Sequence, residues 1–389
     1  MARTPEFYTG RRQRRNYWLI PFVLLLGLIT LLVVLFYGVQ KYAVLTDEGV
    51  KVELPGMEQT AGSTAGSTSE QTQIYDKIVP EIVFEAPDYS RVVAKAGRNV
   101  RPIRAMFLDA YELSEERLQN AAASLVEGNA LLLEMKPRNG QLVWNSKAPL
   151  AVSYGLSTDT EFSNALPSLI PTLKEREDGK TIWLAAQISC FIDDLLANRS
   201  AQYALRTEYG MNYADEAGTW LDPYNADVRN YIVDLARELF QMGFDEVVLA
   251  DVMHPTVETV QNNLGEEVKA SFLYSREMST EPNPITAICG FAVYAEEELK
   301  DRTGLLSIYT DSPRSLVRDD EGSGQNAVLF MKLYDRVYYR TDRYTYTYNL
   351  QDMEGSVPYG NVNDRFVPVV INLIPHDNSS WVYIERLEE

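Results

Sequence analysis

The first strongly hydrophobic feature of the chain is a run of twenty residues without a charged side chain, residues 18–37. An α-helix rises about 1.5 Å per residue, so this run would cover about 30 Å, the thickness of the hydrocarbon core of a bilayer. Four arginines precede it within residues 11–15, and a single lysine follows closely. This charge bias predicts a cytoplasmic basic tail (residues 1–16), a transmembrane signal anchor (residues 17–39) and an extracytoplasmic remainder. A cleaved signal peptide is the alternative, but its apolar region is usually shorter and ends at a small-residue cleavage site.

The polar stretch that follows the apolar run has the composition of a linker. Residues 55–73 are rich in Gly, Ser and Thr and contain the tetrapeptide AGST twice in succession. Such a stretch buries too little apolar surface to offset the entropy of ordering it. We therefore assign residues 40–98 to a juxtamembrane segment and a flexible tether. Residues 99–389 have the composition of a globular domain, and they are long enough for one domain with a substantial core.

Within residues 99–389, short apolar runs alternate with amphipathic segments. Strands are predicted at residues 103–110, 129–135, 181–191, 246–252, 285–291, 305–310 and 366–374. Helices are predicted at residues 114–128, 158–177 (with a break at Pro167 and Pro171), 194–203, 225–242 and 326–338. Alternating strands and helices imply parallel pairing, and about eight such units predict a (β/α)8 TIM barrel, an α/β fold, rather than an open doubly wound sheet. No G-x-G-x-x-G motif follows the first strand, which argues against dinucleotide binding.

Charge and cysteine content exclude several classes of function. The formal net charge is −19, and residues 1–15 contribute five Arg and one Glu, or +4, so the rest of the chain carries −23. An acidic domain without a basic stripe argues against a nucleic-acid partner. Cys190 and Cys289 both lie in apolar, strand-like runs, which indicates buried thiols and leaves a disulfide between them open. Two Cys and two His at distant positions do not have the spacing of a zinc site, and we predict neither a metal nor a cofactor.

In a TIM barrel, the side chains that carry chemistry follow the carboxyl ends of the strands. The residues that fit this position are Asp109, Glu134 with Lys136, Asp193 with Asp194, and Asp251 with His254. Carboxylates gathered at one mouth are what glycoside hydrolysis requires, because one protonates the leaving oxygen and the other acts as base or nucleophile. For Asp193 a simpler interpretation is equally good, because an acidic residue at this position can cap the following helix.

Two blocks of the sequence resemble the putative glycoside hydrolase domain family, an amylase-like (β/α)8 barrel found in bacterial, often exported proteins. The blocks are residues 129–151 and 219–255. Their most specific part is the motif W-L-D-P-Y, which contains Trp220 and Tyr224 and is followed by a helix and G-F-D-E. The resemblance extends over roughly residues 99–389, and it implies the TIM-barrel fold.

The sequence departs from the family pattern where the chemistry is expected. Glu134 stands where the family has Asp, and Lys136 is kept. In the later block, Ala250 occupies the position of a family Asp, and Asp251 occupies that of a Tyr. Successive side chains of a strand point to opposite faces, so Asp251 is expected to face the helix layer unless a bulge re-aims it.

The resemblance leaves more than one function open. The first is an exported hydrolase of a polysaccharide or oligosaccharide, with Glu134 as one catalytic carboxylate and Asp251, Asp109 or Asp193 as the other. The residues expected to contact its substrate are Lys136, Trp220, Tyr224 and His254. The second is a catalytically inactive barrel that binds carbohydrate or serves as an envelope scaffold. A third is a tethered interaction protein without a sugar ligand.

Overall fold

The computed structural model describes residues 43–46, 49–52, 92, 100–125, 129–174, 181–262, 264–274, 283–341, 362–372 and 379–385. The chain forms two compact units, Met1–Val79 and Pro80–Glu389. In the first unit, strands β1 (Ala43–Thr46) and β2 (Gly49–Val52) pair antiparallel. The predicted anchor at residues 17–39 and the Gly/Ser/Thr-rich stretch lie outside the described residues. In the part of the chain that is described, no helix has both the length and the apolar character that a membrane crossing requires.

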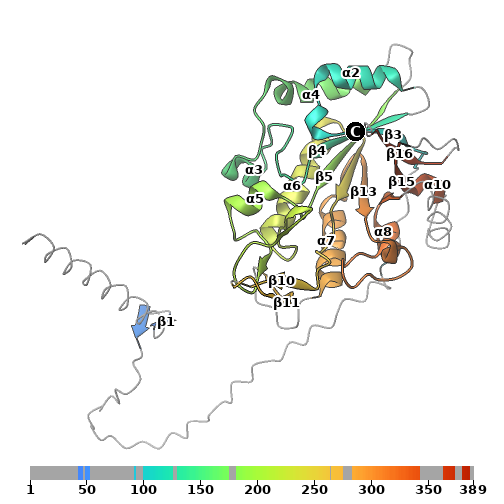
Figure 1. The fold of residues 1–389 in the computed structure, drawn as a ribbon. Helices are drawn as coiled ribbons and strands as arrows, with labels where there is room; N and C mark the ends of the chain where they lie inside the picture. The colour runs from blue at the N-terminus through green and yellow to red at the C-terminus, as the bar shows by residue number, and fades with distance from the viewer. Residues whose placement is uncertain are drawn as a thin grey trace, which may run out of the picture. The chain divides into compact units, whose positions relative to one another are not determined.

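The second unit is built around a closed barrel of eight parallel strands (Figure 1). In chain order the strands are β3 (Arg104–Leu108), β4 (Ala130–Lys136), β5 (Trp183–Ser189), β9 (Glu246–Ala250), β13 (Leu305–Thr310), β14 (Arg336–Arg340), β15 (Phe366–Ile371) and β16 (Trp381–Ile384). Each strand pairs with the next, and β16 pairs with β3 to close the circle. The prediction of a parallel (β/α)8 barrel is therefore confirmed.

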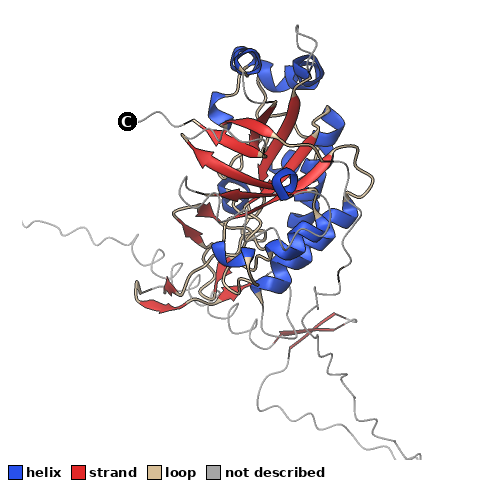
Figure 2. Ribbon diagram, turned by 90° about the vertical axis from the view of Figure 1, so that its right-hand side faces the viewer, coloured by secondary structure: helices blue, strands red, loops and turns tan. Residues whose placement is uncertain are grey.

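Helices lie on the outside of the barrel strands, as Figure 2 shows. They are η2 (Ala110–Glu112), α2 (Glu115–Ser124), α3 (Pro149–Tyr154), α4 (Glu161–Lys174), α5 (Asp194–Arg199), α6 (Ala226–Met242), α7 (Pro284–Glu298), η3 (Pro313–Leu316), α8 (Ala327–Leu333) and α10 (Val362–Arg365). The segments after β5 and β9 contain short strands: β6 (Arg206–Thr207), β7 (Ala214–Asp215), β8 (Gly218–Thr219), β10 (Thr259–Gln261), β11 (Glu267–Lys269) and β12 (Phe272–Leu273). These short strands form antiparallel pairs, including one between β12 and β6.

Helix α6 illustrates how local sequence sets the boundaries of an element. The side chain of Asn225 accepts hydrogen bonds from the backbone N–H groups of Asp227 and Val228, which caps the first turn. Gly243 ends the helix with a left-handed backbone, φ +104°, that glycine adopts without a steric cost. Buried residues recur at helical spacing along one face, namely Val228, Ile232, Leu235 and Leu239. The helix predicted at residues 225–242 is thus confirmed.

Small and branched side chains fill the interior of the barrel. This cluster contains Ile103, Ala105, Ala130, Leu132, Ala185, Val248, Ala250, Val367, Val369 and Val382, together with the rings of Tyr309 and Tyr338. A separate, larger apolar cluster lies between the strands and the helices and includes residues such as Leu131, Leu184, Val247 and Leu306. Neighbouring residues of one strand therefore belong to different clusters, as the alternation of side chains along a strand requires.

Three of the predicted elements are wrong. Residues 285–291, predicted as a strand, belong to α7, because Asn283 caps this segment, Pro284 occupies its first turn and buried residues recur at helical spacing. The helix predicted at residues 326–338 ends at Leu333, and β14 follows it. Helix α4 continues through Pro167 and Pro171 instead of breaking at them.

The two cysteines are buried and free. Cys190 follows β5, and Cys289 lies within α7 rather than in a strand. Burial raises the pKa of both thiols, to about 12 for Cys289. The interpretation of these residues as small buried side chains is confirmed, and the structure contains no disulfide between them.

A pair of glycines provides a test of how the loop after β4 is packed. Gly140 has φ +84°, and a Cβ atom at this position would lie 1.9 Å from Oδ1 of Asp193. Gly210 has a similar backbone, φ +79°, with no heavy atom within 4 Å of such a Cβ. We expect Gly210→Ala to cost about 1 kcal/mol through backbone strain alone. Gly140→Ala adds a steric clash to this strain, so it should lower the Tm by at least about twice as many degrees as Gly210→Ala does. Equal decreases of the Tm in thermal melts of the two variants would contradict the packing described.

Candidate active site

A cavity of about 570 Å³, here termed the mouth cavity, opens at the carboxyl ends of the barrel strands. Each of the eight strands supplies one lining residue from its carboxyl-terminal half. These residues are Phe107, Glu134, Gln187, Ala250, Tyr309, Arg340, Val369 and Ile384. Its ionisable lining residues are Asp109, Glu112, Glu134, Asp251, Asp311 and Glu385, with Arg117, Arg138 and Arg340. This face of a TIM barrel is where active sites are found.

Glu134 projects into the mouth cavity from β4, and its side chain is partly buried. Burial raises its pKa to about 7, and the negative charges of Asp109 and Asp251 act in the same direction. The backbone N–H of Ala110, which donates to Oε2 at 3.3 Å, and the nearby Arg138 oppose this rise. A carboxyl group with this pKa holds its proton in part of the population at neutral pH, as a general acid must.

Asp251 also lines the mouth cavity, which corrects the expectation that it would face the helix layer. It follows the last residue of β9 and has φ +52°, a left-handed conformation that is uncommon outside glycine. This turn of the backbone re-aims the carboxylate, while Ala250 packs in the apolar interior of the barrel. The alternation rule failed here because the strand ends before Asp251, and the rule applies only within an extended strand.

Arg138 and Ser189 hold the Asp251 carboxylate from two sides. The Nη2 atom of Arg138 donates to Oδ1 at 2.6 Å, and its Nε lies 3.1 Å from both carboxylate oxygens. The hydroxyl of Ser189 donates to Oδ2 at 2.7 Å. Asp251 is 5% exposed, so these charge-assisted bonds compensate for the removal of its charge from water. Sequence reasoning missed Arg138, because its partner Asp251 is distant in the sequence.

Asp311 is a third carboxylate of the mouth cavity that sequence reasoning missed. It directly follows β13, and its Oδ2 atom is buried and accepts no hydrogen bond from the described residues. Burial raises its pKa to about 6, reinforced by the charge of Asp251 and opposed by Arg340 and Arg138. The signal was present in the sequence, since the criterion that selected Asp109, an acid at the carboxyl end of a predicted strand, applies equally to Asp311.

The buried side chain of Gln325 connects the segment that carries Asp251 to the segment that carries Asp311. Its Oε1 accepts hydrogen bonds from the backbone N–H groups of Asp311 and Ser312, at 3.0 and 3.1 Å, and from the hydroxyl of Thr310. Its Nε2 donates to the backbone carbonyl of Val252 at 3.0 Å. One amide group thus joins the segment after β13 to the segment after β9.

Two of the predicted acids have structural partners. Asp109 lies on the rim of the mouth cavity and accepts a hydrogen bond from the backbone N–H of Tyr111, which caps η2. Asp193 is fully buried, caps α5 through the backbone N–H of Leu196 and forms a 3.0 Å ion pair with Lys136. Neither Asp193 nor Lys136 lines the mouth cavity, and the capping interpretation of Asp193 is confirmed.

The predicted aromatic contacts lie away from the mouth cavity. Trp220 is 1% exposed and packs in a small apolar cluster with Ile192 and Leu205. Tyr224 is buried, and its hydroxyl donates to the backbone carbonyl of Asn283 at 2.7 Å. Both rings pack among the loops that surround the barrel, and neither lines the mouth cavity.

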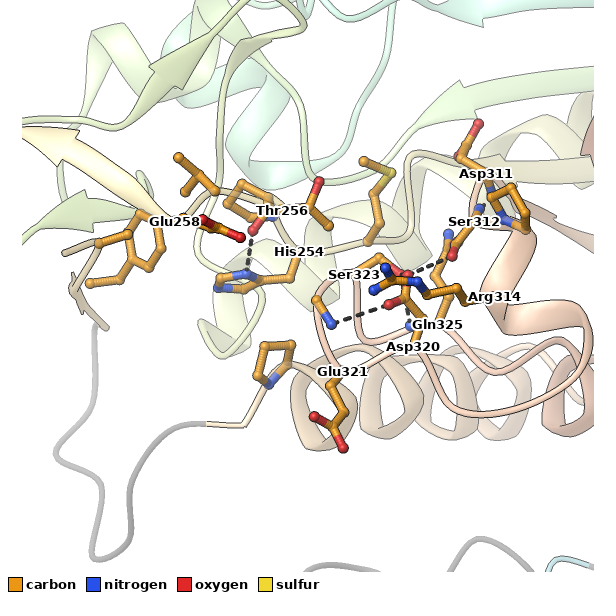
Figure 3. Close-up of a pocket in the computed structure, with 18 of the residues that line it drawn as sticks. His254, Thr256, Glu258, Asp311, Ser312, Arg314, Asp320, Glu321, Ser323 and Gln325 are labelled. Carbon is orange, nitrogen blue, oxygen red and sulfur yellow. Dashed lines mark hydrogen bonds between the residues drawn. The ribbon is translucent and has the colours of Figure 1, made fainter.

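His254 lines a different cavity of about 880 Å³, here termed the lateral cavity, between the segments after β9 and β13 (Figure 3). Its Nε2 lies 3.1 Å from the hydroxyl of Tyr274, and its Nδ1 lies 3.1 Å from the backbone carbonyl of Pro255. Burial lowers the pKa of His254 to about 4, against the effect of the Pro255 carbonyl, so the ring is neutral at physiological pH. Among the described residues, no group of three or more His, Cys, Asp or Glu side chains is arranged to hold a metal ion.

Comparison with solved structures shows which proteins this chain is similar to. A hypothetical protein from Ruminiclostridium thermocellum shares 26% identity over 52% of this chain and 96% of its own, with a TM-score of 0.42. The PgaB (BpsB) glycoside hydrolase domain from Bordetella bronchiseptica shares 12% identity over 73% of this chain and 93% of its own, with a TM-score of 0.48. No curated protein matches the sequence.

The family comparison is more specific. Residues 105–340 match a family described as "putative glycosyl hydrolase domain". This region starts in β3 and ends with β14, so it contains Glu134, Asp251 and Asp311. Because the match spans more than half of the chain, the protein belongs to the putative glycosyl hydrolase domain family.

Proposed function

We propose that the protein is a membrane-anchored, extracytoplasmic glycoside hydrolase that acts on a cell-surface or extracellular glycan. The observation that carries this proposal is the arrangement of Glu134 and Asp251, which line one cavity at the carboxyl ends of the strands. They differ in environment, since burial raises the pKa of Glu134 to about 7 whereas Asp251 forms an ion pair with Arg138. Glycoside hydrolysis requires one carboxyl group that donates a proton and a second that acts on the opposite side of the bond as base or nucleophile.

In the proposed mechanism the two groups have distinct roles. Protonated Glu134 gives its proton to the glycosidic oxygen, so that the leaving sugar departs as an alcohol. A water molecule forms the new bond to the anomeric carbon and gives up a proton to one of the two carboxylates, so that hydrolysis leaves a hydroxyl group on each product. Asp251, which forms an ion pair with Arg138, places negative charge next to the anomeric carbon, where positive charge develops in the transition state. The fork of Arg138 fixes the orientation of the Asp251 carboxylate.

A second candidate function is carbohydrate binding without hydrolysis, as an inactive barrel or envelope scaffold. It is favoured by the saturation of Asp251, because both carboxylate oxygens already accept hydrogen bonds from Arg138 and Ser189. It is also favoured by Ala250, which stands where the family usually has an Asp. Turnover in the wild-type protein separates the two candidates.

The membrane-anchored location of this proposal rests on the sequence. The apolar run of residues 18–37 is long enough to span a bilayer, and the arginines at residues 11–15 favour a cytoplasmic N-terminus. The barrel then faces the exterior, where glycans are found.

Glu134→Gln should lower kcat by at least about 100-fold, because the amide keeps the shape of the side chain but cannot donate an acidic proton. In the wild-type protein, kcat/KM should fall as the pH rises through about 7, where Glu134 loses its proton. The measurement is release of reducing ends from a panel of purified glycans. The matched control is Glu112→Gln, on the exposed rim of the same cavity, which should retain most of the activity.

Two outcomes would contradict the catalytic proposal. Turnover by Glu134→Gln at the wild-type rate would remove Glu134 from the mechanism. Binding of a glycan by the wild-type protein without turnover would support the non-hydrolytic candidate instead.

The raised pKa of Glu134 also predicts how stability depends on pH. The pKa is about 7 in the folded protein against an ordinary value of 4.5, so the folded state binds this proton more tightly. The associated stability is fully present below about pH 4.5 and is lost as the pH rises through 7. Glu134→Gln stays neutral, and a pKa raised from 4.5 to about 7 corresponds to about 3 kcal/mol, so the Tm of this variant relative to wild type should be on the order of 5–10 °C higher at pH 8 than at pH 4.5. An equal Tm difference at both pH values in thermal melts would contradict the buried position of Glu134.

The proposed topology predicts the outcome of limited proteolysis. Protease added to intact cells with an accessible envelope should remove the barrel, while an epitope tag at the N-terminus stays protected. The barrel and the tag are followed by immunoblotting with separate antibodies. Cleavage of the tag together with protection of the barrel would show that the orientation is the opposite of the one proposed.

A further inference from the structure

The lateral cavity adjoins the mouth cavity. Asp311, which directly follows β13, lines both of them. Figure 3 shows the side chain of Asp311 directed away from the cluster that surrounds His254. A ligand in the mouth cavity can therefore extend past Asp311 and Ser312 into the lateral cavity without leaving the protein surface.

Hydrogen bonds hold the walls of the lateral cavity in place. The backbone N–H of His254 donates to the carbonyl of Ser323 at 2.8 Å, which ties the segment after β9 to the segment after β13. The buried carboxylate of Asp320 accepts hydrogen bonds from the hydroxyls of Ser312 and Ser323. Together with the Gln325 amide, these bonds make the lateral cavity a preformed site, which limits the entropy that binding would cost.

The cavity combines aromatic rings with exposed polar groups. Phe272 and Tyr274 line one side of the cavity and are partly exposed. Each ring makes an edge contact with a neighbouring tyrosine, Phe272 with Tyr213 and Tyr274 with Tyr224. Ring faces suit the C–H surfaces of sugars. The polar side chains of Thr256, Glu258 and Arg314 reach into the same space from the two loops, as Figure 3 shows, and can bond to hydroxyl groups.

The charge of the two cavities restricts the ligand further. The lateral cavity is lined by four carboxylates (Glu258, Asp311, Asp320 and Glu321) and one cation (Arg314) among the described residues. The mouth cavity is lined by six carboxylates and three arginines. An anionic group entering either cavity meets an excess of negative charge in a partly desolvated space, which disfavours its binding.

We propose that the lateral cavity binds the further sugar units of a glycan chain whose scissile bond lies in the mouth cavity, and that this chain carries no anionic groups. This inference rests on the proposed function, because it assigns the mouth cavity to a saccharide. It adds a chain length and a charge class to the substrate.

The test is the affinity of the purified full chain for saccharides of different length and charge. Isothermal titration uses the dimer and the hexamer of four series, namely malto-oligosaccharides, cello-oligosaccharides, chitosan oligomers (cationic) and oligogalacturonates (anionic). In at least one of the first three series, the hexamer should bind at least about tenfold more tightly than the dimer. The oligogalacturonate hexamer should bind at least about tenfold more weakly than that hexamer.

A blocking substitution assigns the gain in affinity to the lateral cavity. Ser271 is an exposed lining residue, and Ser271→Trp should remove the tenfold advantage of the hexamer while the affinity for the dimer stays at the wild-type value. The matched control is Leu264→Trp, at a residue that is 82% exposed and lines neither cavity, which should keep the advantage. If thermal melts show that Ser271→Trp is unfolded, Glu258→Trp fills the same space from an exposed position.

The inference is overturned if no series gains affinity with length, if the blocked variant binds the hexamer as the wild-type protein does, or if the anionic hexamer binds most tightly. Failure of the proposed function is measured separately, as the absence of turnover. Hexamer binding that is lost in the blocked variant would support the lateral cavity even in a protein without turnover.

Discussion

Closure of the barrel is the constraint on which the candidate site depends. The backbone N–H of Trp381 donates to the carbonyl of Ile103 at 2.7 Å, and the register of β16 on β3 begins from that point. Because all eight strands are parallel, closure brings all their carboxyl ends to one rim. Glu134 from the second barrel strand and Asp251 after the fourth can then line one cavity, although 117 residues separate them in the sequence.

A buried charge strengthens the opposite end of the barrel. Glu246, the first residue of β9, is fully buried and accepts hydrogen bonds from Ser307, Tyr338 and Trp183, and it forms an ion pair with Arg336. These partners come from the three strands β5, β13 and β14. A buried carboxylate with every partner in place favours one register of neighbouring strands, because a shift by one residue would leave its charge unpaired. Register at this end in turn sets the height of each strand end at the mouth.

The elements with one dominant local signal could be predicted from the sequence. The strand at residues 305–310 and the helix at residues 225–242 are clear because hydrophobic period and flanking residues agree. The apolar run at residues 285–291 gave the wrong structure, because so short a run does not distinguish a strand from a buried segment of a helix, and the cap at Asn283 decides for a helix. The site was recovered in part. Position at the carboxyl end of a strand identified Glu134, but the partnership of Arg138 with Asp251 spans 113 residues and depends on tertiary structure alone.

The left-handed residue at the end of β9 affects how activity is judged across a family. Catalytic competence is commonly inferred from whether an acid occupies a given alignment column, and by that criterion Ala250 marks this chain as inactive. The backbone at Asp251, with φ +52°, returns a carboxylate to the barrel mouth from the next column. A column-by-column comparison therefore misses a carboxylate that is present in space, and it would miss the same group in homologues with the same one-residue displacement.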